Sequence, residues 1–323
     1  MMGNRRLVIG VDLGGTNIRS AIVSAEGSTL ARDKRPTGAQ DGYRSVIERI
    51  AESVKTVMGV SGFAPVAIGL AVPGAIDFKR GVVTYSPNLP GWINAKVAED
   101  LSAMVAVPAY LENDANAAAA GEGWIGAAAE WENFSMLTLG TGVGGAIVLN
   151  RQVWHGSSGM AGELGHLPSG KPGRVCGCGR DGCVEAYASA SGVMKTAHER
   201  FYENDAIWIR TAAGDFVGKV DARLLARGAG EGDPLCREIF DEAGACLGRI
   251  LSAVALTLDV ANVVIGGGMA EALAFIEPGM RREALKMAYT LNETKLKITK
   301  AALGDDAGIL GAARIAMKSA GIC

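Results

Sequence analysis

Apolar and polar positions follow one another in a pattern that predicts strands separated by helices. In the first part of the chain, runs of strand length and stretches of helical spacing occur in the order 6–11, 18–23, 43–59, 66–74, 97–105, 108–114 and 115–127. Strands that alternate with helices predict an α/β fold with a mostly parallel sheet. Ligands of such sheets bind at the carboxyl ends of the strands, so polar residues there are the first candidates for a site.

The rest of the chain continues this alternation with one interruption. Residues 203–218 show no clear period, and we interpret them as a surface excursion that could contact another subunit. The regular segments around this interruption are predicted helices at about 189–202, at 234–258 and at 308–321, and predicted strands at 261–269 and 296–301.

A short glycine-rich segment near the first strand recurs later in the chain. GTNIRSAIV at 15–23 matches GTGVGGAIV at 140–148 in five of nine positions, and each copy follows an apolar strand. Two strands joined by a glycine-rich turn form a hairpin whose backbone N–H groups can face an anion, although a plain β-turn would explain one copy equally well. The repeat therefore indicates two related halves, each opening with a phosphate-facing hairpin.

The composition favours a globular protein with small-molecule ligands. The 323 residues are 49% hydrophobic and 20% charged, and this length allows two domains that each bury a core. A net charge of −2 gives no basic field for nucleic acid or an anionic membrane. The apolar stretch at 250–258 is interrupted by Ser252 and Thr257 and is too short to span a bilayer.

The segment 162–185 concentrates metal-binding side chains. His166, Cys176, Cys178 and Cys183 lie within eighteen residues, among glycines that allow tight turns. One imidazole and three thiolates complete a tetrahedral Zn²⁺ shell with no position left for water, so we expect a structural zinc. A disulfide or a set of buried thiols is the alternative. The opening of the chain, MMGNRRLVIGVDLGG, has no secretory signal, which favours a reducing cytoplasm and therefore the metal.

Two acidic residues flank this cluster, Glu163 before it and Glu185 after it. If a metal closes the loop, both carboxylates are held where they can accept hydrogen bonds from a polyhydroxylated ligand. The remaining cysteines are scattered. We expect Cys236 and Cys246 to be inert buried thiols in a helix, and we assign no chemistry to Cys323.

Asp114 follows a predicted strand and precedes an alanine-rich helix, between Asn113 and Asn116. A carboxylate at the end of a strand, in a chain with two phosphate-facing turns, suits a general base for a hydroxyl. The alternative is that Asp114 only caps the helix. A second glycine run, 266–268, follows a strand. It could let a nucleotide lie against a helix, or it could serve close packing of helix on strand.

With these motifs in place, the chain resembles the ROK family of bacterial sugar kinases. The most specific matches are GELGH at 162–166 and CGCGRDGCVE at 176–185. The other matching motifs are DLGGT at 12–16, VPGAID at 72–77, NLPGW at 88–92, LENDAN at 111–116, GTGVGG at 140–145 and IGGG at 265–268.

The resemblance implies a two-lobed actin-like ATPase fold, related to ribonuclease H, with a duplicated βαβ core and a zinc-bound loop. We expect an N-terminal lobe at 1–117, with a C-terminal helix at about 306–323 packing back on it. The C-terminal lobe is expected at 118–305, with the zinc loop at 162–185.

The resemblance also implies residue roles. Asp114 would be the general base, and Asp12 would lie near the Mg²⁺ of ATP. The glycine motifs would cradle ATP through Gly14, Gly15, Thr16, Gly140, Thr141, Gly142, Gly144, Gly266, Gly267 and Gly268. The hexose would be lined by Gly74, Asn88, Asn113, Asp114, Glu163, His166 and Glu185, so that His166 would both bind zinc and face the sugar.

The activity implied is ATP-dependent phosphorylation of the 6-hydroxyl of glucose by a cytoplasmic homodimer or homotetramer. N-acetylglucosamine, mannose and allose are alternative substrates. The same family contains sugar-responsive repressors, which carry a helix-turn-helix segment ahead of the first hairpin. Here only about five residues precede that hairpin and the catalytic aspartate is present, which favours the enzyme.

Overall fold

The computed structural model describes residues 7–61 and 64–322, and the chain divides into two compact units. Unit 1 contains Met1–Glu132, Ile147–Gly162 and Ala302–Cys323, and unit 2 contains Asn133–Ala146 and Glu163–Ala301. Arg6, which begins the first predicted strand, and Cys323, which ends the predicted C-terminal helix, lie outside the described residues. Unit 1 thus includes 118–132, Ile147–Gly162 and 302–305, which the predicted division assigned to the C-terminal lobe.

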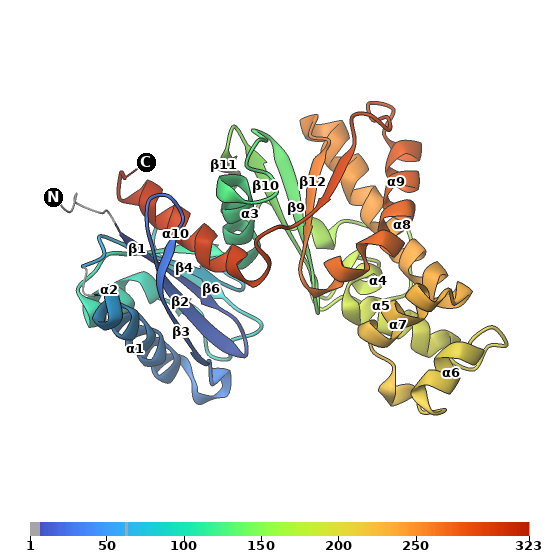
Figure 1. The fold of residues 1–323 in the computed structure, drawn as a ribbon, viewed down its shortest axis with the longest axis horizontal. Helices are drawn as coiled ribbons and strands as arrows, with labels where there is room; N and C mark the ends of the chain where they lie inside the picture. Colours follow the sequence, from blue (N-terminus) through green and yellow to red (C-terminus); the bar gives the residue numbers. More distant parts are fainter. Residues whose placement is uncertain (1–6, 62–63, 323) are drawn as a thin grey trace. The chain divides into compact units, whose positions relative to one another are not determined.

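Unit 1 is built on a five-stranded sheet with the order β3-β2-β1-β4-β8 (Figure 1). Its strands are β1 (Val8–Leu13), β2 (Asn17–Val23), β3 (Thr29–Pro36), β4 (Ile68–Val72) and β8 (Ala109–Asn113). The first three strands are antiparallel neighbours, whereas β1, β4 and β8 run parallel. The sheet is therefore mixed, and the prediction of a mostly parallel sheet was wrong because it did not foresee β3.

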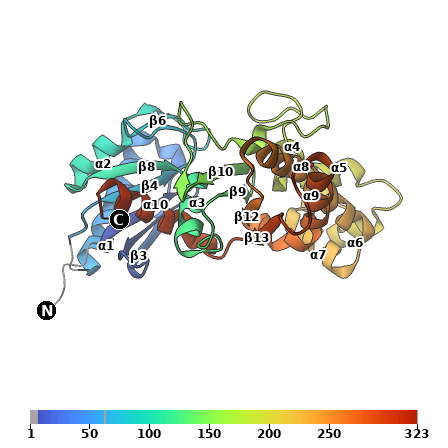
Figure 2. The same ribbon diagram turned by 90° about the horizontal axis from the view of Figure 1, so that it is seen from above.

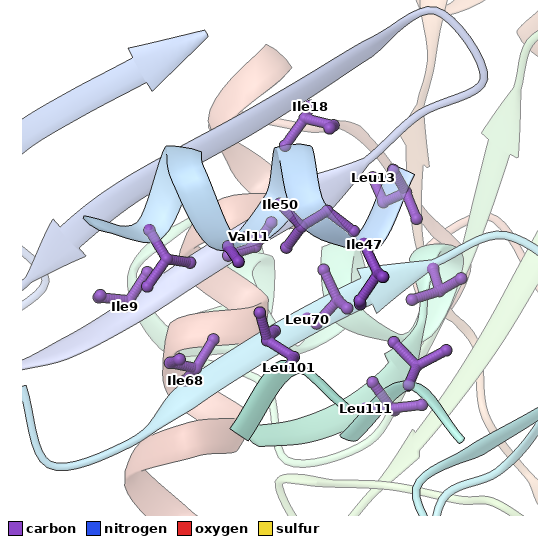
Figure 3. Close-up of a cluster of buried hydrophobic side chains, with 14 of the residues drawn as sticks. Ile9, Val11, Leu13, Ile18, Ile47, Ile50, Ile68, Leu70, Leu101 and Leu111 are labelled. Atoms are coloured by element: carbon purple, nitrogen blue, oxygen red, sulfur yellow. The ribbon is translucent and has the colours of Figure 1, made fainter. Parts of the chain in front are cut away.

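Strand β1 is buried on both faces, and its alternate residues meet different helices. Ile9, Val11 and Leu13 pack in one core with α1 (Tyr43–Ser61) and α2 (Val97–Val105), as the labelled side chains in Figure 3 show. Val8 packs on the other face with α10 (Ala307–Ser319). Helices on both faces explain why the strand is a continuous apolar run and not an alternating one.

Glycines in two strands let α10 lie close to the sheet. A Cβ at Gly10 would overlap the carbonyl oxygen of Ile309, and one at Gly69 would overlap that of Ala312. Helix α3 (Asp114–Ile125) packs beside α10 in the same way, since a Cβ at Gly311 would overlap the carbonyl oxygen of Ala117. The C-terminal helix is therefore an integral part of unit 1, and its approach depends on residues without side chains.

Unit 2 repeats this plan. The second sheet has the order β11-β10-β9-β12-β13, in which a hairpin is again followed by two parallel strands. Its strands are β9 (Phe134–Leu139), β10 (Val143–Leu149), β11 (Gln152–Val153), β12 (Asn262–Gly266) and β13 (Lys297–Lys300). The hairpins β1–β2 and β9–β10 occupy matching places in the two sheets, which confirms the duplication that the sequence repeat indicated.

The longest helix of unit 2, α8 (Pro234–Leu258), packs along α9 (Leu273–Met287), and both views show them side by side (Figure 2). The pair approaches closely because a Cβ at Gly244 would overlap the carbonyl oxygen of Ile276. The bounds of α8 are those predicted. Helix α5 (Ala190–Arg200) also lies within its predicted range.

Residues 203–218 are not an irregular excursion. They contain α6 (Ile207–Ala213), whose Ile209 and Ala213 are buried, and Trp208 Nε1 donates a hydrogen bond to Glu231 at the end of α7 (Ala222–Glu231). The sequence also gave no signal for α7, for the short α4 (Glu185–Ala188), or for a three-stranded antiparallel sheet of β5 (Ala75–Asp77), β6 (Val82–Tyr85) and β7 (Ile93–Ala95). Among the described residues, no helix combines the length and apolarity needed to cross a membrane.

The close approach of α10 yields a stability prediction. Gly69→Ala should destabilise the protein by about 2 kcal/mol or more, because the new Cβ would displace the backbone at Ala312. Gly59→Ala is the matched control. Gly59 is exposed in α1 with open space around it, so alanine should raise stability by up to about 1 kcal/mol. Urea unfolding of both variants measures the difference, and equal stabilities would contradict the proposed packing.

Candidate functional site

The turn from β8 into α3 presents Asp114 to solvent. The N-cap of α3 is Asn113, whose side chain accepts hydrogen bonds from the backbone N–H groups of Ala115 and Asn116 at 3.0 and 3.2 Å. Asp114 Oδ1 accepts from Ala115 N at 2.9 Å. Asn113 and not Asp114 therefore fills the cap position, and the role of Asp114 as a general base stays a prediction.

A buried carboxylate beneath this turn was missed by the sequence analysis. Glu112 Oε1 accepts from the backbone N–H of Asn113 at 3.0 Å and from Asn116 Nδ2 at 3.1 Å. Its other oxygen, Oε2, lies 2.8 Å from His155 Nε2. The Glu112 side chain is only 4% exposed, so these bonds lie inside the structure.

Two further residues assigned to the hexose, Gly74 and Asn88, also belong to unit 1. Asn113 Nδ2 donates to the carbonyl oxygen of Gly74 at 3.3 Å, which joins the two predicted residues directly. Gly74 has φ of 117°, and a Cβ there would overlap the carbonyl oxygen of Tyr85, so only glycine fits. Asn88 lies in the exposed turn after β6.

The first glycine turn connects β1 to β2. Gly15 and Thr16 are exposed, while the turn is held by Gly14 N donating to Asn17 O at 2.9 Å and by the Thr37 hydroxyl donating to Gly14 O at 2.6 Å. A turn with fixed ends and exposed residues is compatible with anion binding, which stays a prediction.

Asp12, at the end of β1, has a carboxyl whose pKa is raised by its surroundings. Burial, together with the neighbouring Asp114 and Asp305, raises its pKa to about 6 against the opposing effect of Arg19. Arg19 Nη1 is 4.0 Å from Asp12 Oδ2. Two neighbouring carboxyl groups disfavour each other's ionisation, and a divalent cation bound beside them would stabilise both carboxylates.

In unit 2, the predicted metal ligands converge. The ligand atoms of His166, Cys176, Cys178 and Cys183 all lie within 4.8 Å of one another. Cys178 Sγ is 3.7 Å from Cys183 Sγ, and Cys176 Sγ is 3.6 Å from His166 Nδ1. A tetrahedral shell with Zn–S of about 2.3 Å and Zn–N of about 2.0 Å has edges of roughly 3.5–3.8 Å. The donor set and both edges therefore fit Zn²⁺, and the sulfur separation is far beyond a disulfide bond of about 2.05 Å.

The pKa values of the three thiols also bear on the assignment of a bound cation. Burial raises the pKa of the Cys176 and Cys183 thiols, whereas a backbone hydrogen bond near Arg180 lowers the pKa of the more exposed Cys178. Without a cation, the two buried sulfurs would be neutral. A bound dication supplies the charge that holds them as thiolates.

Both flanking carboxylates lie against this cluster. Glu163 Oε2 is 3.7 Å from His166 Nε2, the ring nitrogen that does not face the thiols. Glu185 Oε1 accepts from Cys176 Sγ at 3.2 Å, and its Oε2 accepts from Val143 N at 3.0 Å. The three residues assigned to the hexose in unit 2 are thus brought together.

The second glycine turn packs on the same loop. A Cβ at Gly142 would overlap the Glu185 carboxylate, and one at Gly165 would overlap the carbonyl oxygen of Val143. Gly140 N donates to Gly142 O at 3.0 Å, and the Ser191 hydroxyl donates to Thr141 O at 3.0 Å. Gly144 follows on β10.

The three glycines of the run 266–268 have different surroundings. Gly267 has φ of 82°, and a Cβ there would overlap the carbonyl oxygen of Leu139, while a Cβ at Gly266 would lie 2.8 Å from the end of Met136. Close packing therefore explains these two glycines. Gly268 has open space around its Cα, and its role toward nucleotide stays a prediction.

Comparison with known proteins decides the family. The ROK family model matches residues 8–319. The chain belongs to the ROK family. The resemblance inferred from the motifs is thereby confirmed, and so is the two-lobed α/β fold of ROK sugar kinases.

Several characterised ROK proteins are similar along their whole length. A glucokinase from Thermotoga maritima is 34% identical over 308 residues, covering 95% of this chain and 96% of that protein. The crystal structure of a ROK hexokinase from Thermus thermophilus is 33% identical with a TM-score of 0.81, covering 98% and 100%. A ROK family glucokinase from Streptomyces griseus, in complex with glucose and AMPPNP, is 30% identical with a TM-score of 0.80, covering 97% and 99%.

This ROK chain also has a cavity beside the second glycine turn. It measures about 270 Å³ and is lined by Thr141, Cys176, Glu185, Ser191 and Lys195, among others. All its lining residues belong to unit 2. The second glycine turn, a lysine and the loop that carries the predicted metal ligands therefore border one space.

The environment of Asp12 yields a pH prediction. Its folded-state pKa of about 6 lies above the ordinary 3.8, so the carboxyl destabilises the fold as pH rises from about 4 through 6, and the full cost persists above that. Asp12→Asn should therefore raise stability at pH 7.5 by about 1–3 kcal/mol, with the gain vanishing toward pH 4. Thermal unfolding at both pH values measures it. Asp215→Asn, at an exposed position, should change neither midpoint, and an Asp12 variant less stable at pH 7.5 would contradict the assignment.

Proposed function

We propose that this ROK protein is an ATP-dependent hexose kinase that transfers a phosphoryl group to the 6-hydroxyl of glucose. The observation that carries this proposal is the exposed Asp114 at the strand end, with Asn113 and not Asp114 as the helix cap. The relatives support it, since glucokinases are 31–34% identical over nearly the whole chain. N-acetylglucosamine, mannose and allose remain the alternative acceptors.

Asp114 is assigned as the base that accepts the proton of the attacking hydroxyl. Phosphoryl transfer requires mainly alignment and charge neutralisation, so an ordinary carboxylate suffices when the proton leaves late. The hexose is assigned to Gly74, Asn88 and Asn113 beside Asp114 in unit 1, and to Glu163, His166 and Glu185 in unit 2. In unit 2, Glu163 lies beside His166 Nε2 and Glu185 lies beside Cys176, so both carboxylates adjoin one loop and can accept hydrogen bonds from hydroxyls.

The nucleotide is assigned to the glycine turns, with Gly14, Gly15 and Thr16 in unit 1 and Gly140, Thr141, Gly142 and Gly144 in unit 2. Asp12 would orient the hydrated Mg²⁺ that neutralises phosphate charge. Its raised pKa is consistent with a carboxyl built to meet a cation. Gly266, Gly267 and Gly268 are assigned to the nucleotide on the family resemblance alone.

We assign Zn²⁺ to His166, Cys176, Cys178 and Cys183 in a structural role. Four protein ligands fill a tetrahedral shell, so the metal would shape the loop and not activate water. The two measured edges and the donor set support this assignment. Assembly as a homodimer or homotetramer and a cytoplasmic location stay predictions.

The function is tested by a coupled ADP-release assay with glucose. Asp114→Asn should lower kcat by about 10² or more, because the base is lost, while glucose affinity changes little. The control Asp233→Asn exchanges the same groups at the N-cap of α8, where asparagine caps equally well, and should retain full turnover. An unchanged kcat for Asp114→Asn would exclude this base. Absence of wild-type turnover with glucose, against activity on another hexose in the same assay, would redirect the substrate assignment.

The metal assignment is tested by elemental analysis. About one zinc per chain is expected, and Cys178→Ala should lower both zinc content and glucose affinity, because the loop loses a ligand. Cys246→Ala removes a buried thiol of α8 outside the cluster and should leave the zinc content unchanged. If metal-free protein bound glucose as tightly as the native protein, the link between metal and sugar would be disproved.

A further inference from the structure

The bond between Glu112 and His155 lies directly beneath the turn that carries Asp114, and no motif of the sequence analysis includes His155. Resting on the proposed function, we propose that Glu112 and His155 are positioning residues for Asp114. The pair fixes the turn from β8 into α3 from inside unit 1, and neither residue needs to touch the substrate.

The argument begins with the acceptor capacity of Glu112. Its two oxygens face three donors, namely the backbone N–H of Asn113, the amide of Asn116 and the imidazole of His155. Because a carboxylate only accepts hydrogen bonds, Nε2 of His155 is the donor at 2.8 Å. The bonds to Asn113 and Asn116 hold the residues on either side of Asp114. The bond from His155 fixes the Glu112 carboxylate that accepts the other two.

The imidazole is itself held in place. Its ring stacks on Phe78, with centroids 4.2 Å apart and planes inclined by 26°. The loop after His155 packs on the phenyl ring of Phe78, because a Cβ at Gly159 would lie 3.5 Å from that ring and 3.0 Å from Ile76 O. The His155 side chain is 22% exposed, and Glu112 is 4% exposed. A ring fixed by stacking can hold the carboxylate in one rotamer.

Loss of the imidazole donor has a defined consequence. Glu112 Oε2 would be buried without its hydrogen bond, which is costly for a charged oxygen, so the carboxylate would turn toward other donors or water. The bonds to Asn113 and Asn116 would then weaken, and Asp114 would be held less precisely. Small displacements of a catalytic group lower turnover strongly, whereas they affect nucleotide binding at a separate turn much less.

The position of His155 in the chain adds a second link. His155 belongs to the segment Ile147–Gly162 of unit 1. The residue that follows this segment, Glu163, begins the part of unit 2 to which sugar binding is assigned. The Glu112–His155 bond therefore ties the base-bearing turn to the segment that leads into the metal loop. Glucose KM should respond to its loss more than ATP KM does.

Two substitutions separate hydrogen bonding from stacking. His155→Phe keeps a ring on Phe78 but donates no hydrogen bond, and His155→Gln donates through its amide. We expect kcat to fall by about 10-fold or more in the phenylalanine variant and to stay within about threefold of wild type in the glutamine variant. ATP KM should stay within about twofold in both. His198→Gln, which alters a histidine of unit 2 near Val220 O, should change none of these constants.

Glu112→Gln provides a test that does not depend on the folding of the phenylalanine variant. A carboxamide has one acceptor oxygen for three donors, so kcat should again fall by about 10-fold or more. Combined with His155→Phe, the loss should be clearly smaller than the product of the two single losses, because both act through one carboxylate.

Hydrogen exchange supplies a readout that does not require activity. Amide exchange in a peptide covering 112–116 should accelerate in His155→Phe and not in His155→Gln. The positioning role would be overturned if His155→Phe kept the kcat and the amide exchange of the wild-type protein. It would also be overturned if kcat fell equally in the two His155 variants. A merely structural role would lower the melting temperature and the folded fraction in parallel while leaving kcat per folded molecule unchanged. Failure of the wild-type protein to phosphorylate any hexose would instead overturn the proposed function.

Discussion

The cluster of His166 and three cysteines is the interaction on which the site of unit 2 depends. Between Glu163 and Glu185 the chain has a 3₁₀ turn at Leu164–His166 and two isolated β-bridges, and backbone hydrogen bonds such as Ser169 N to Gly182 O join its two sides. Ligand atoms within 4.8 Å of one another add side-chain convergence to this backbone framework. The loop then lies close to the second glycine turn, where Gly142 and Gly165 leave room and Glu185 bonds to Val143. The predicted metal ligands, the Glu185 carboxylate and the second glycine turn are thereby parts of one local structure.

In unit 1, the candidate site residue Asp114 is positioned by regular secondary structure and not by a cluster of metal-binding side chains. Asp114 is placed by a strand that ends and a helix that begins, with Asn113 as cap and Glu112 as a buried acceptor below. Glu122, fully buried, makes a comparable anchor at the other end of α3 by accepting from the backbone N–H groups of Ala127, Ala302 and Leu303. Positioning by regular structure and buried carboxylates requires no metal. A change in the loop 162–185 should therefore leave the position of Asp114, the proposed base, unaltered.

The sequence was informative where chemistry or periodicity is local. The ligands of the metal loop are close in sequence and surrounded by glycine, and α8 has a long apolar stripe bounded by Asp233 and Asp259, so both could be predicted. His155 could not, because it meets Glu112 from 43 positions away and nothing near it in the chain marks that contact. Strands of three or four residues such as β5 and β6 are too short to show alternation, and α6 is stabilised by packing on α7 more than by its own pattern. The cap of α3 was ambiguous because three of four adjacent residues can cap a helix.

Asp12 shows why local preference and function diverge at this site. An aspartate at the end of a buried strand, near a second carboxylate and under the first turn of α10, is unfavourable for folding, as its pKa of about 6 records. Arg19 offsets part of the charge but stands 4.0 Å away, and its guanidinium also serves Asp305 at 3.1 Å. A fold selected for stability alone would place a neutral residue at this position. Unit 1 instead keeps two mutually repelling carboxyl groups, Asp12 and Asp114, and such a pair is stabilised when a cation neutralises one member and a proton reaches the other. In the proposed transfer of a phosphoryl group to a hydroxyl, the Mg²⁺ of ATP and the hydroxyl proton would be these two partners.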